Sequence, residues 1–240
     1  MIDYGDRGRL GALIPSGNAV AEPELRAMLP PGLGLVVTRL ELRGSSEAEL
    51  LRMASGIEPA ARLLADARPD AIAFHCTAVS TFAPALATEI RRRIEDATGL
   101  PALATADAIL AALGALGARR VVLVTPYIEA VHAREIAFLE AGGFDLAGSS
   151  CLGVDGNAEM ARIAPVAIAE QTRAAVAAAS AAEVCLISCT AIRSGVLIAA
   201  LEAEIGMPVV TSNTAMAWHA ARTLGLRDGV QGFGRLLAQR

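Results

Sequence analysis

The 240-residue chain has few aromatic residues, which make up 3% of it, although 54% of its residues are hydrophobic. Its core must therefore be built from Ala, Leu, Val and Ile. Alanine-rich helices packed on strands of β-branched residues are typical of an α/β protein. The chain lacks an apolar run long enough to span a bilayer. Because Asp3, Asp6 and Arg7 interrupt the region where a signal peptide would be apolar, we expect a cytoplasmic protein without a membrane partner.

Basic residues are not concentrated in the sequence, and the formal net charge is -4. The longest basic run is Arg91-Arg92-Arg93, which is too short to indicate a nucleic-acid partner. We interpret this run as the solvated face of a helix, with an anion-binding patch as the alternative.

Metal and cofactor sites are also poorly supported. The spacing of Cys185 and Cys189 does not match a redox or zinc motif, and a cytoplasmic protein rarely contains a disulfide framework. The glycine-rich stretch at 229–234 follows a helical segment rather than a strand, so it fails the dinucleotide fingerprint. The candidate ligands are few: Cys76, Cys151, Cys185, Cys189, His75, His132 and His219. We therefore expect neither a metal site nor a dinucleotide-binding site.

What the chain does contain is one stretch that occurs twice. Residues 71–79 read AIAFHCTAV and residues 184–192 read VCLISCTAI. Each is a short apolar run, typical of a buried strand, that ends in a cysteine followed by Thr-Ala. Ligands of open parallel sheets bind at the carboxyl ends of the strands. The repeated position predicts a site that contains both Cys76 and Cys189, whereas a lone cysteine is more often a core residue. Cys185 and Cys151 fit structural roles.

Strands and helices alternate along the chain, which favours a mostly parallel sheet. Ser46 and Glu49 form a capping box for one helical segment, and residues 152–157 form a polar loop. Strands are expected at 9–15, 35–42, 102–105, 120–125, 144–150 and 208–212, and before each repeated cysteine. Helices are expected at 21–29, 47–67 with a break near Gly56 and Pro59, 84–98, 107–116, 129–141, 165–181, 196–205 and 214–224.

The repeat extends over two halves of the chain, because Gly99-Leu100-Pro101 has a counterpart in Gly206-Met207-Pro208. We predict two similar Rossmann-like α/β domains with parallel four-stranded sheets, related by a pseudo-twofold axis. The first comprises residues 1–105 plus 214–240, and the second residues 106–213. The active site would lie in the cleft between them, and the final helix would pack back on the first domain.

Two facing cysteines permit specific chemistry. A cysteine is nucleophilic or basic as a thiolate, which a helix N-terminus stabilises. Thiols on opposite sides of a planar carbon can remove a proton on one face and deliver it on the other. Alternatively, one thiolate adds covalently while the other acts as an acid. Thr77 and Thr190 add hydroxyl donors for a substrate carboxylate, and His75 would point to the opposite face of its strand.

These residues and four further motifs resemble the aspartate/glutamate racemase superfamily, in its branch of maleate cis-trans isomerases and arylmalonate decarboxylases. The motifs are IPSGN at 14–18, RVVLVTPY at 120–127, DGNAE at 155–159 and GFGRLL at 232–237. The resemblance implies an active site of two cysteines, two asparagines and a tyrosine: Cys76, Cys189, Asn18, Asn157 and Tyr127.

The resemblance further implies that Cys76 attacks a double-bond carbon of a small cis-dicarboxylate and that Cys189 handles the proton at the other carbon. Maleate to fumarate is the specific expectation, with no cofactor or metal and with a homodimer as the assembly. Asn18, Tyr127 and Asn157 would bind the carboxylates. From the residues alone, these three could instead serve as a helix cap, a core residue and a turn residue.

Three alternatives stay open. The decarboxylases carry glycine at the first cysteine position, so Cys76 argues against that activity. The amino-acid racemases usually carry Asn-Thr after the first cysteine, where this chain has Thr77-Ala78. A third alternative, from a different class, is a non-catalytic binding protein for small acids.

Overall fold

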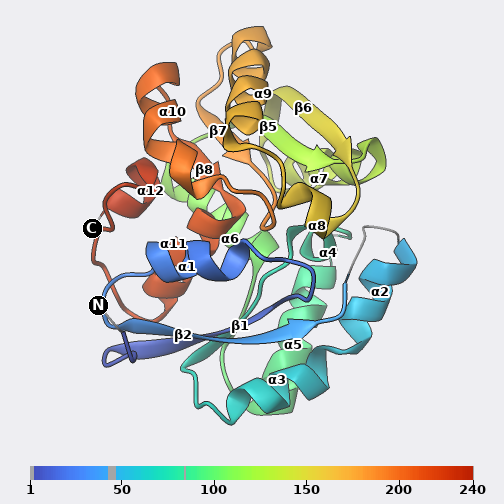
Figure 1. Cartoon of the computed structure of the whole chain (residues 1–240), viewed down its shortest axis with the longest axis vertical. Coiled ribbons are helices and arrows are strands. Elements are labelled where there is room, and N and C mark those ends of the chain that lie inside the picture. The colour runs from blue at the N-terminus through green and yellow to red at the C-terminus, as the bar shows by residue number, and fades with distance from the viewer. Residues whose placement is uncertain (1–2, 43–46, 84, 240) are drawn as a thin grey trace.

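The computed structural model describes residues 3–42, 47–83 and 85–239 of the chain. Two parallel sheets lie in separate halves of the molecule, with helices around and between them (Figure 1). The first sheet has the strand order β2-β1-β3-β4. Its strands are β1 (Gly8–Pro15), β2 (Leu33–Leu40), β3 (Ala71–Phe74) and β4 (Ala102–Ala104).

The second sheet repeats this plan with the order β6-β5-β7-β8, and its neighbouring strands are again parallel. Its strands are β5 (Arg120–Tyr127), β6 (Asp145–Val154), β7 (Val184–Ile187) and β8 (Val209–Thr211). The prediction of two parallel four-stranded sheets is confirmed. The domain boundaries drawn from the sequence stay a prediction.

The helices of the first half connect its strands and continue from β4 toward the second half. They are α1 (Ala21–Met28), α2 (Glu47–Ser55), α3 (Ile57–Ala65), α4 (Thr77–Ser80), α5 (Leu86–Thr98) and α6 (Thr105–Ala115). The helices of the second half are α7 (Glu129–Ala141), α8 (Asn157–Met160), α9 (Pro165–Ala178), the short 3-10 turn η1 (Gly195–Leu197), α10 (Ile198–Ile205), α11 (Ser212–Thr223) and α12 (Gly234–Ala238).

The repeated Gly-x-Pro segments have the same structural role in both halves. Gly99 ends α5 with φ 70° and Gly206 ends α10 with φ 75°, so both are in the left-handed region that glycine adopts without steric cost. A proline two residues later prevents the helix from continuing. The chain can then enter the fourth strand of each sheet directly.

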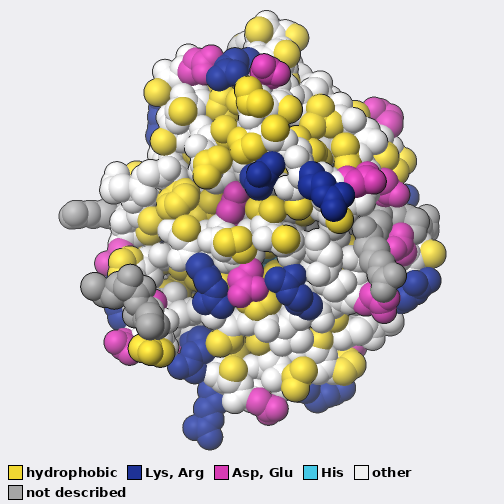
Figure 2. Space-filling view, in the orientation of Figure 1, with side chains coloured by type: hydrophobic (Ala, Val, Ile, Leu, Met, Phe, Trp, Pro, Cys, Tyr) yellow, Lys and Arg dark blue, Asp and Glu magenta, His cyan; other side chains and the backbone are white. Residues whose placement is uncertain are grey.

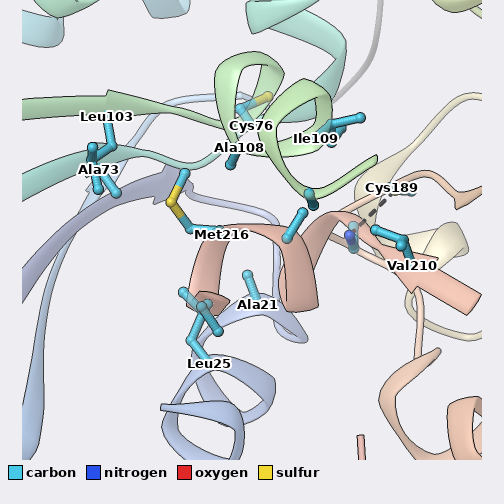
Figure 3. Close-up of a cluster of buried hydrophobic side chains, with 14 of the residues drawn as sticks. Ala21, Leu25, Ala73, Cys76, Leu103, Ala108, Ile109, Cys189, Val210 and Met216 are labelled. Atoms are coloured by element: carbon cyan, nitrogen blue, oxygen red, sulfur yellow. Dashed lines mark hydrogen bonds between the residues drawn. The ribbon is translucent and has the colours of Figure 1, made fainter. Parts of the chain in front are cut away.

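The two halves are joined by helices rather than by a continuous sheet. Helix α11 packs against α6, its counterpart in the repeat, and also against α1. In Figure 3, Met216 of α11 lies among Ala21 and Leu25 of α1 and Ala108 of α6. The predicted contact between the final long helix and the first half is therefore present.

The surface carries charges of both signs, interspersed in the view of Figure 2. The three-arginine run lies on α5, where each arginine is paired with a carboxylate of Asp107, Glu89 or Glu58. Its interpretation as a charged, solvated helix face agrees with these pairs. Among the described residues, no helix combines the length and apolar character needed to cross a membrane.

The structure corrects several predicted boundaries. The predicted loop at 152–157 is reduced to residues 155–156, because β6 continues to Val154 and Asn157 begins α8. Helices α6 and α11 begin two residues earlier than predicted, at Thr105 and Ser212. The short helices α4 and α12 were not predicted. Ser46 of the expected capping box and Pro84, the expected start of one helix, lie outside the described residues.

Candidate active site

Cys76 and Cys189 occupy equivalent places at the carboxyl ends of β3 and β7. Cys76 has an extended backbone, with φ -145° and ψ 111°, and directly precedes α4. Its thiol accepts hydrogen bonds from the backbone N–H groups of Ala78 and Val79. The thiol of Cys189 accepts a 3.2 Å hydrogen bond from the backbone N–H of Ala191, drawn as a dashed line in Figure 3. In each half, the thiol therefore accepts hydrogen bonding from the backbone just after it in the chain.

Both thiols are buried, with Cys76 4% and Cys189 2% exposed. Burial raises the pKa of each to about 12, because a thiolate loses its solvation there. The charge of Cys189 raises the pKa of Cys76 further, so the two groups are electrostatically coupled. Ionising both thiols together is unfavourable, so the pair loses at most one proton.

Tyr127 of the second half lies close to the two thiols. It is the last residue of β5, and its side chain is buried. A hydrogen bond from the Tyr127 hydroxyl to the Cys189 thiol lowers the pKa of Cys189, which partly offsets the effect of burial. Burial, together with the nearby thiols and Glu135, raises the pKa of Tyr127 well above its usual value. The hydroxyl therefore stays protonated and acts as a donor.

Asn18 connects the first half to the loop that follows Cys189. Its side-chain Oδ1 accepts hydrogen bonds from the backbone N–H groups of Val20 and Ala21, both at 2.9 Å, so it caps the start of α1. Its Nδ2 donates to Thr190 Oγ1 at 3.0 Å. Both residues are buried beside the Cys189 strand end. An amide nitrogen has two N–H donors, of which Thr190 receives one.

Asn157 of the second half contacts the first half near Gly17 and Leu42. As the first residue of α8 it is half-buried, and its Nδ2 donates to the carbonyl of Leu42 at 3.3 Å. A Cβ placed at Gly17 would lie 3.2 Å from the Asn157 Cβ, so the turn before Asn18 leaves little room for a larger residue. The same short helix contacts the site through Met160, whose sulfur lies 3.8 Å from that of Cys189.

Thr77 lies at the start of α4 and belongs to a buried row of polar side chains. Its Oγ1 donates to Ser212 Oγ at 2.9 Å. Ser212 Oγ lies 3.4 Å from Ser188 Oγ, which donates to Glu135 Oε1 at 2.7 Å. The row passes from the residue after Cys76 to the residue before Cys189, and so links the two thiol-bearing loops.

A second buried network of hydrogen bonds joins the two halves through His75, Asn213 and Glu24. His75 is fully buried, its Nε2 lies 2.8 Å from Asn213 Oδ1, and burial lowers its pKa to about 4. Asn213 Nδ2 in turn donates to Glu24 Oε2 at 2.7 Å, and Glu24 Oε1 accepts from Gly195 N at 2.8 Å. His75 is thus a neutral, hydrogen-bonded core residue, although the sequence also allowed it to act as a base.

Sequence reasoning did not identify Glu135, Ser188 or Ser212 as residues next to the site. Ser188 and Ser212 adjoin strand ends, a position that could have suggested them. Glu135 has a clearer signal, because it shares the inward face of α7 with Val131 and Leu139. A carboxylate on the apolar face of a helix is uncommon unless it has a partner or a function. Among the described residues no cluster of three metal-binding side chains is present.

Known proteins resemble this chain over nearly its whole length. A sequence model of arylmalonate decarboxylase matches residues 10–237. A maleate isomerase from Nocardia farcinica is 34% identical over 244 residues, which cover 96% of each chain. An arylmalonate decarboxylase from Bordetella bronchiseptica is 36% identical over 144 residues, or 60% of each chain.

Solved structures agree with the sequence comparisons. A cysteine-to-serine variant of the Nocardia farcinica maleate cis-trans isomerase, with a covalently bound succinylcysteine intermediate, has a TM-score of 0.89 at 30% identity, covering 97% of this chain and 99% of that one. A liganded arylmalonate decarboxylase, with one glycine changed to cysteine and one cysteine to serine, has a TM-score of 0.89 at 29% identity, covering 96% and 98%. The resemblance stated from the sequence is confirmed, and the chain belongs to the arylmalonate decarboxylase family, whose named members here are isomerases and decarboxylases.

Proposed function

We propose that this protein is a cofactor-independent cis-trans isomerase of a small dicarboxylate, with maleate converted to fumarate. The observation that carries the proposal is the pair of coupled, buried thiols at equivalent strand ends, with Tyr127 bonded to one of them. The 34% identity to a maleate isomerase and the succinylcysteine intermediate of a related structure support it.

In the proposed reaction the Cys76 thiolate adds to one double-bond carbon of maleate, and the electron pair of the double bond moves toward the adjacent carboxylate. Cys189 supplies the proton that converts the resulting enediolate to a succinyl adduct. The former double bond is now single and can rotate. Cys189 then removes the proton, the double bond re-forms, and Cys76 leaves as a thiolate. One proton and one negative charge shared by the two thiols are sufficient for the cycle.

The remaining polar groups suit the two carboxylates of the substrate. We assign Asn18, Thr77, Tyr127, Asn157 and Thr190 to carboxylate binding. Donors that are fixed before the substrate arrives stabilise the developing enediolate without reorganisation. Asn18 and Thr190 hold each other by a hydrogen bond, and Tyr127 is held by Cys189.

The test follows fumarate formation from maleate by proton NMR, in the wild type and in Cys76→Ala and Cys189→Ala. We expect turnover by the wild type and a loss of at least about 10³-fold in each variant, because each removes a group that reacts with the substrate. Cys185→Ala is the matched control, since Cys185 is equally buried but lies within β7. It should retain most of the activity.

A second measurement addresses the intermediate. Cys189→Ser, incubated with maleate, should gain the mass of one maleic acid on Cys76, as shown by mass spectrometry of the intact protein and its peptides. Absence of turnover by the wild type would reject the maleate assignment, and normal turnover by both alanine variants would reject the two-thiol mechanism. An arylmalonate assayed in parallel would reveal a decarboxylase.

A further inference from the structure

Glu135 is a buried carboxyl close to the thiols that the proposed reaction does not use. It is 2% exposed, and its Oε1 accepts the hydrogen bond from Ser188. Its Oε2 has no hydrogen-bond partner among the described residues. The charge of Glu135 acts on two other acids, Cys189 after β7 and Tyr127 of β5, and Cys76 acts on Tyr127 as well. His132, one turn earlier on α7, is paired with Thr125 instead. This environment disfavours a carboxylate, and burial raises the pKa of Glu135 to about 8.

Ser188 and Ser212 connect this carboxyl to Thr77. All three hydroxyl groups of the row are at most 1% exposed, so bulk water does not compete for their hydrogen bonds. The bond between Ser188 and Ser212 can run in either direction. Because each hydroxyl has a single hydrogen to donate, the direction of one bond sets the direction of the next.

An ionised Glu135 therefore fixes the direction of the row, whereas a protonated Glu135 allows the row to reverse. When Glu135 is ionised it can only accept, so Ser188 donates to it, Ser212 donates to Ser188, and Thr77 donates to Ser212. When Glu135 carries a proton on Oε1, that proton can be donated to Ser188. The whole row then reverses, and the Thr77 hydrogen is freed from its bond to Ser212.

We propose that Glu135 is a positioning residue that, by holding a proton, reverses the hydroxyl row and presents Thr77 as a hydrogen-bond donor to a substrate carboxylate. The proposal rests on the proposed function, since a carboxylate accepts hydrogen bonds and a non-donating hydroxyl would repel it. Substrate binding then selects the protonated form of Glu135, and the proton comes from bulk water.

The role of Glu135 is tested by measuring the binding of succinate, a saturated dicarboxylate that cannot isomerise. Calorimetry in buffers of different ionisation enthalpy gives both the affinity and the number of protons taken up. Succinate is fully ionised above about pH 7 and contributes no proton of its own. In the wild type, the affinity for succinate should fall about tenfold between about pH 7 and about pH 9.5. A change of this size is expected when one hydrogen bond to a charged group is lost. Proton uptake on binding should appear at about pH 8 to 9.

Two variants should remove the pH dependence of succinate binding. In Glu135→Gln the amide N–H can donate to Ser188 at any pH, so affinity should be independent of pH and no proton should be taken up. Ser188→Ala breaks the row between Glu135 and Ser212, and should remove the pH dependence as well. Glu140→Gln, an exposed glutamate on the same helix, should behave as the wild type.

The outcomes separate the two proposals. Succinate binding with the same pH profile and proton uptake in wild type and Glu135→Gln would overturn the role of Glu135 and leave the proposed function intact. If neither succinate nor maleate binds at any pH, the proposed function fails and the role of Glu135 fails with it. A purely structural role of Glu135 would alter stability without flattening the pH profile.

Discussion

At the scale of single residues, Glu135 is a buried carboxyl with few partners. Its Oε1 accepts a hydrogen bond from Ser188, and its Oε2 has no partner among the described residues.

Burial of Glu135 should also make stability depend on pH. Its pKa is raised in the folded state, so its favourable contribution is complete below about pH 4.5 and is lost as pH rises through about 8. Glu135→Gln does not ionise, so its free energy of unfolding relative to wild type should increase across this window, by on the order of 4 kcal/mol. Urea unfolding at several pH values measures this difference.

The exposed glutamate Glu140 provides the comparison, because its conversion to glutamine should change stability little at any pH. If the difference between Glu135→Gln and wild type stays constant between about pH 5 and about pH 9, Glu135 is not a buried acid of raised pKa.

The two cysteines of the proposed site could be predicted from the sequence more readily than the residues around them. Cys76 and Cys189 recur at equivalent strand ends, and such a recurrence is a local signal. Ser188, Ser212 and Glu135 come together only through contacts between residues far apart in the chain. Their single positions, next to strand ends or on an apolar helix face, gave local indications, but no motif within one segment encodes the row that they form.

At the scale of elements, α1 of the first half holds the loop that follows Cys189 in the second. Glu24 accepts hydrogen bonds from Gly195 and Asn213, and Asn18 at the start of α1 bonds Thr190. Gly195 fits tightly, because a Cβ there would lie 2.8 Å from Met28 Cε and 3.0 Å from Glu24 Cδ. The position of the second thiol therefore depends on a helix of the opposite half.

We expect Gly195→Ala to destabilise the protein by about 1–3 kcal/mol, because the added methyl group displaces Glu24 and Met28. Activity should fall as well, since the loop after Cys189 loses its contacts. Thermal unfolding and the maleate assay measure the two effects. Gly114→Ala is the matched control, because a Cβ at this exposed helical glycine meets no atom within 4 Å. It should be neutral or stabilising by up to about 1 kcal/mol; equal stability of the two variants would contradict the tight fit.

Some ends of helices and strands could not be predicted from the local sequence pattern. The strand β5 was predicted because its residues are apolar and buried on both faces. The end of β6 was missed because it is an edge strand, rich in small and polar residues and half-exposed along its length. Helix α8 has four residues, too few for a helical periodicity to appear. Asn157 was consequently placed in a loop, although it begins this helix.

At the scale of the whole molecule, the two sheets share one hydrophobic cluster that extends across α1, α6 and α11. Neither half can unfold without exposing the apolar surface that the other covers. The homodimer and the cytoplasmic location expected from the sequence stay predictions.

The shared cluster should make unfolding cooperative. We expect a single transition in urea in which Trp218 fluorescence, reporting on α11 at the join, coincides with far-ultraviolet circular dichroism, reporting on all helices. Two separated transitions, or a fluorescence change that precedes the loss of helix, would show that the halves unfold independently.

The pairing of α6 with α11 has a consequence for substrate choice. Each thiol is fixed to the end of a strand in its own sheet, and each of these helices directly follows the last strand of a sheet. The gap between the sulfur atoms is therefore set largely by how closely two alanine-rich helices approach. A larger side chain at Ala108 of α6, which lies beside Met216 of α11 in Figure 3, would move the two helices apart. Under the proposed function, the length of dicarboxylate that fits between the thiols is a property of helix packing.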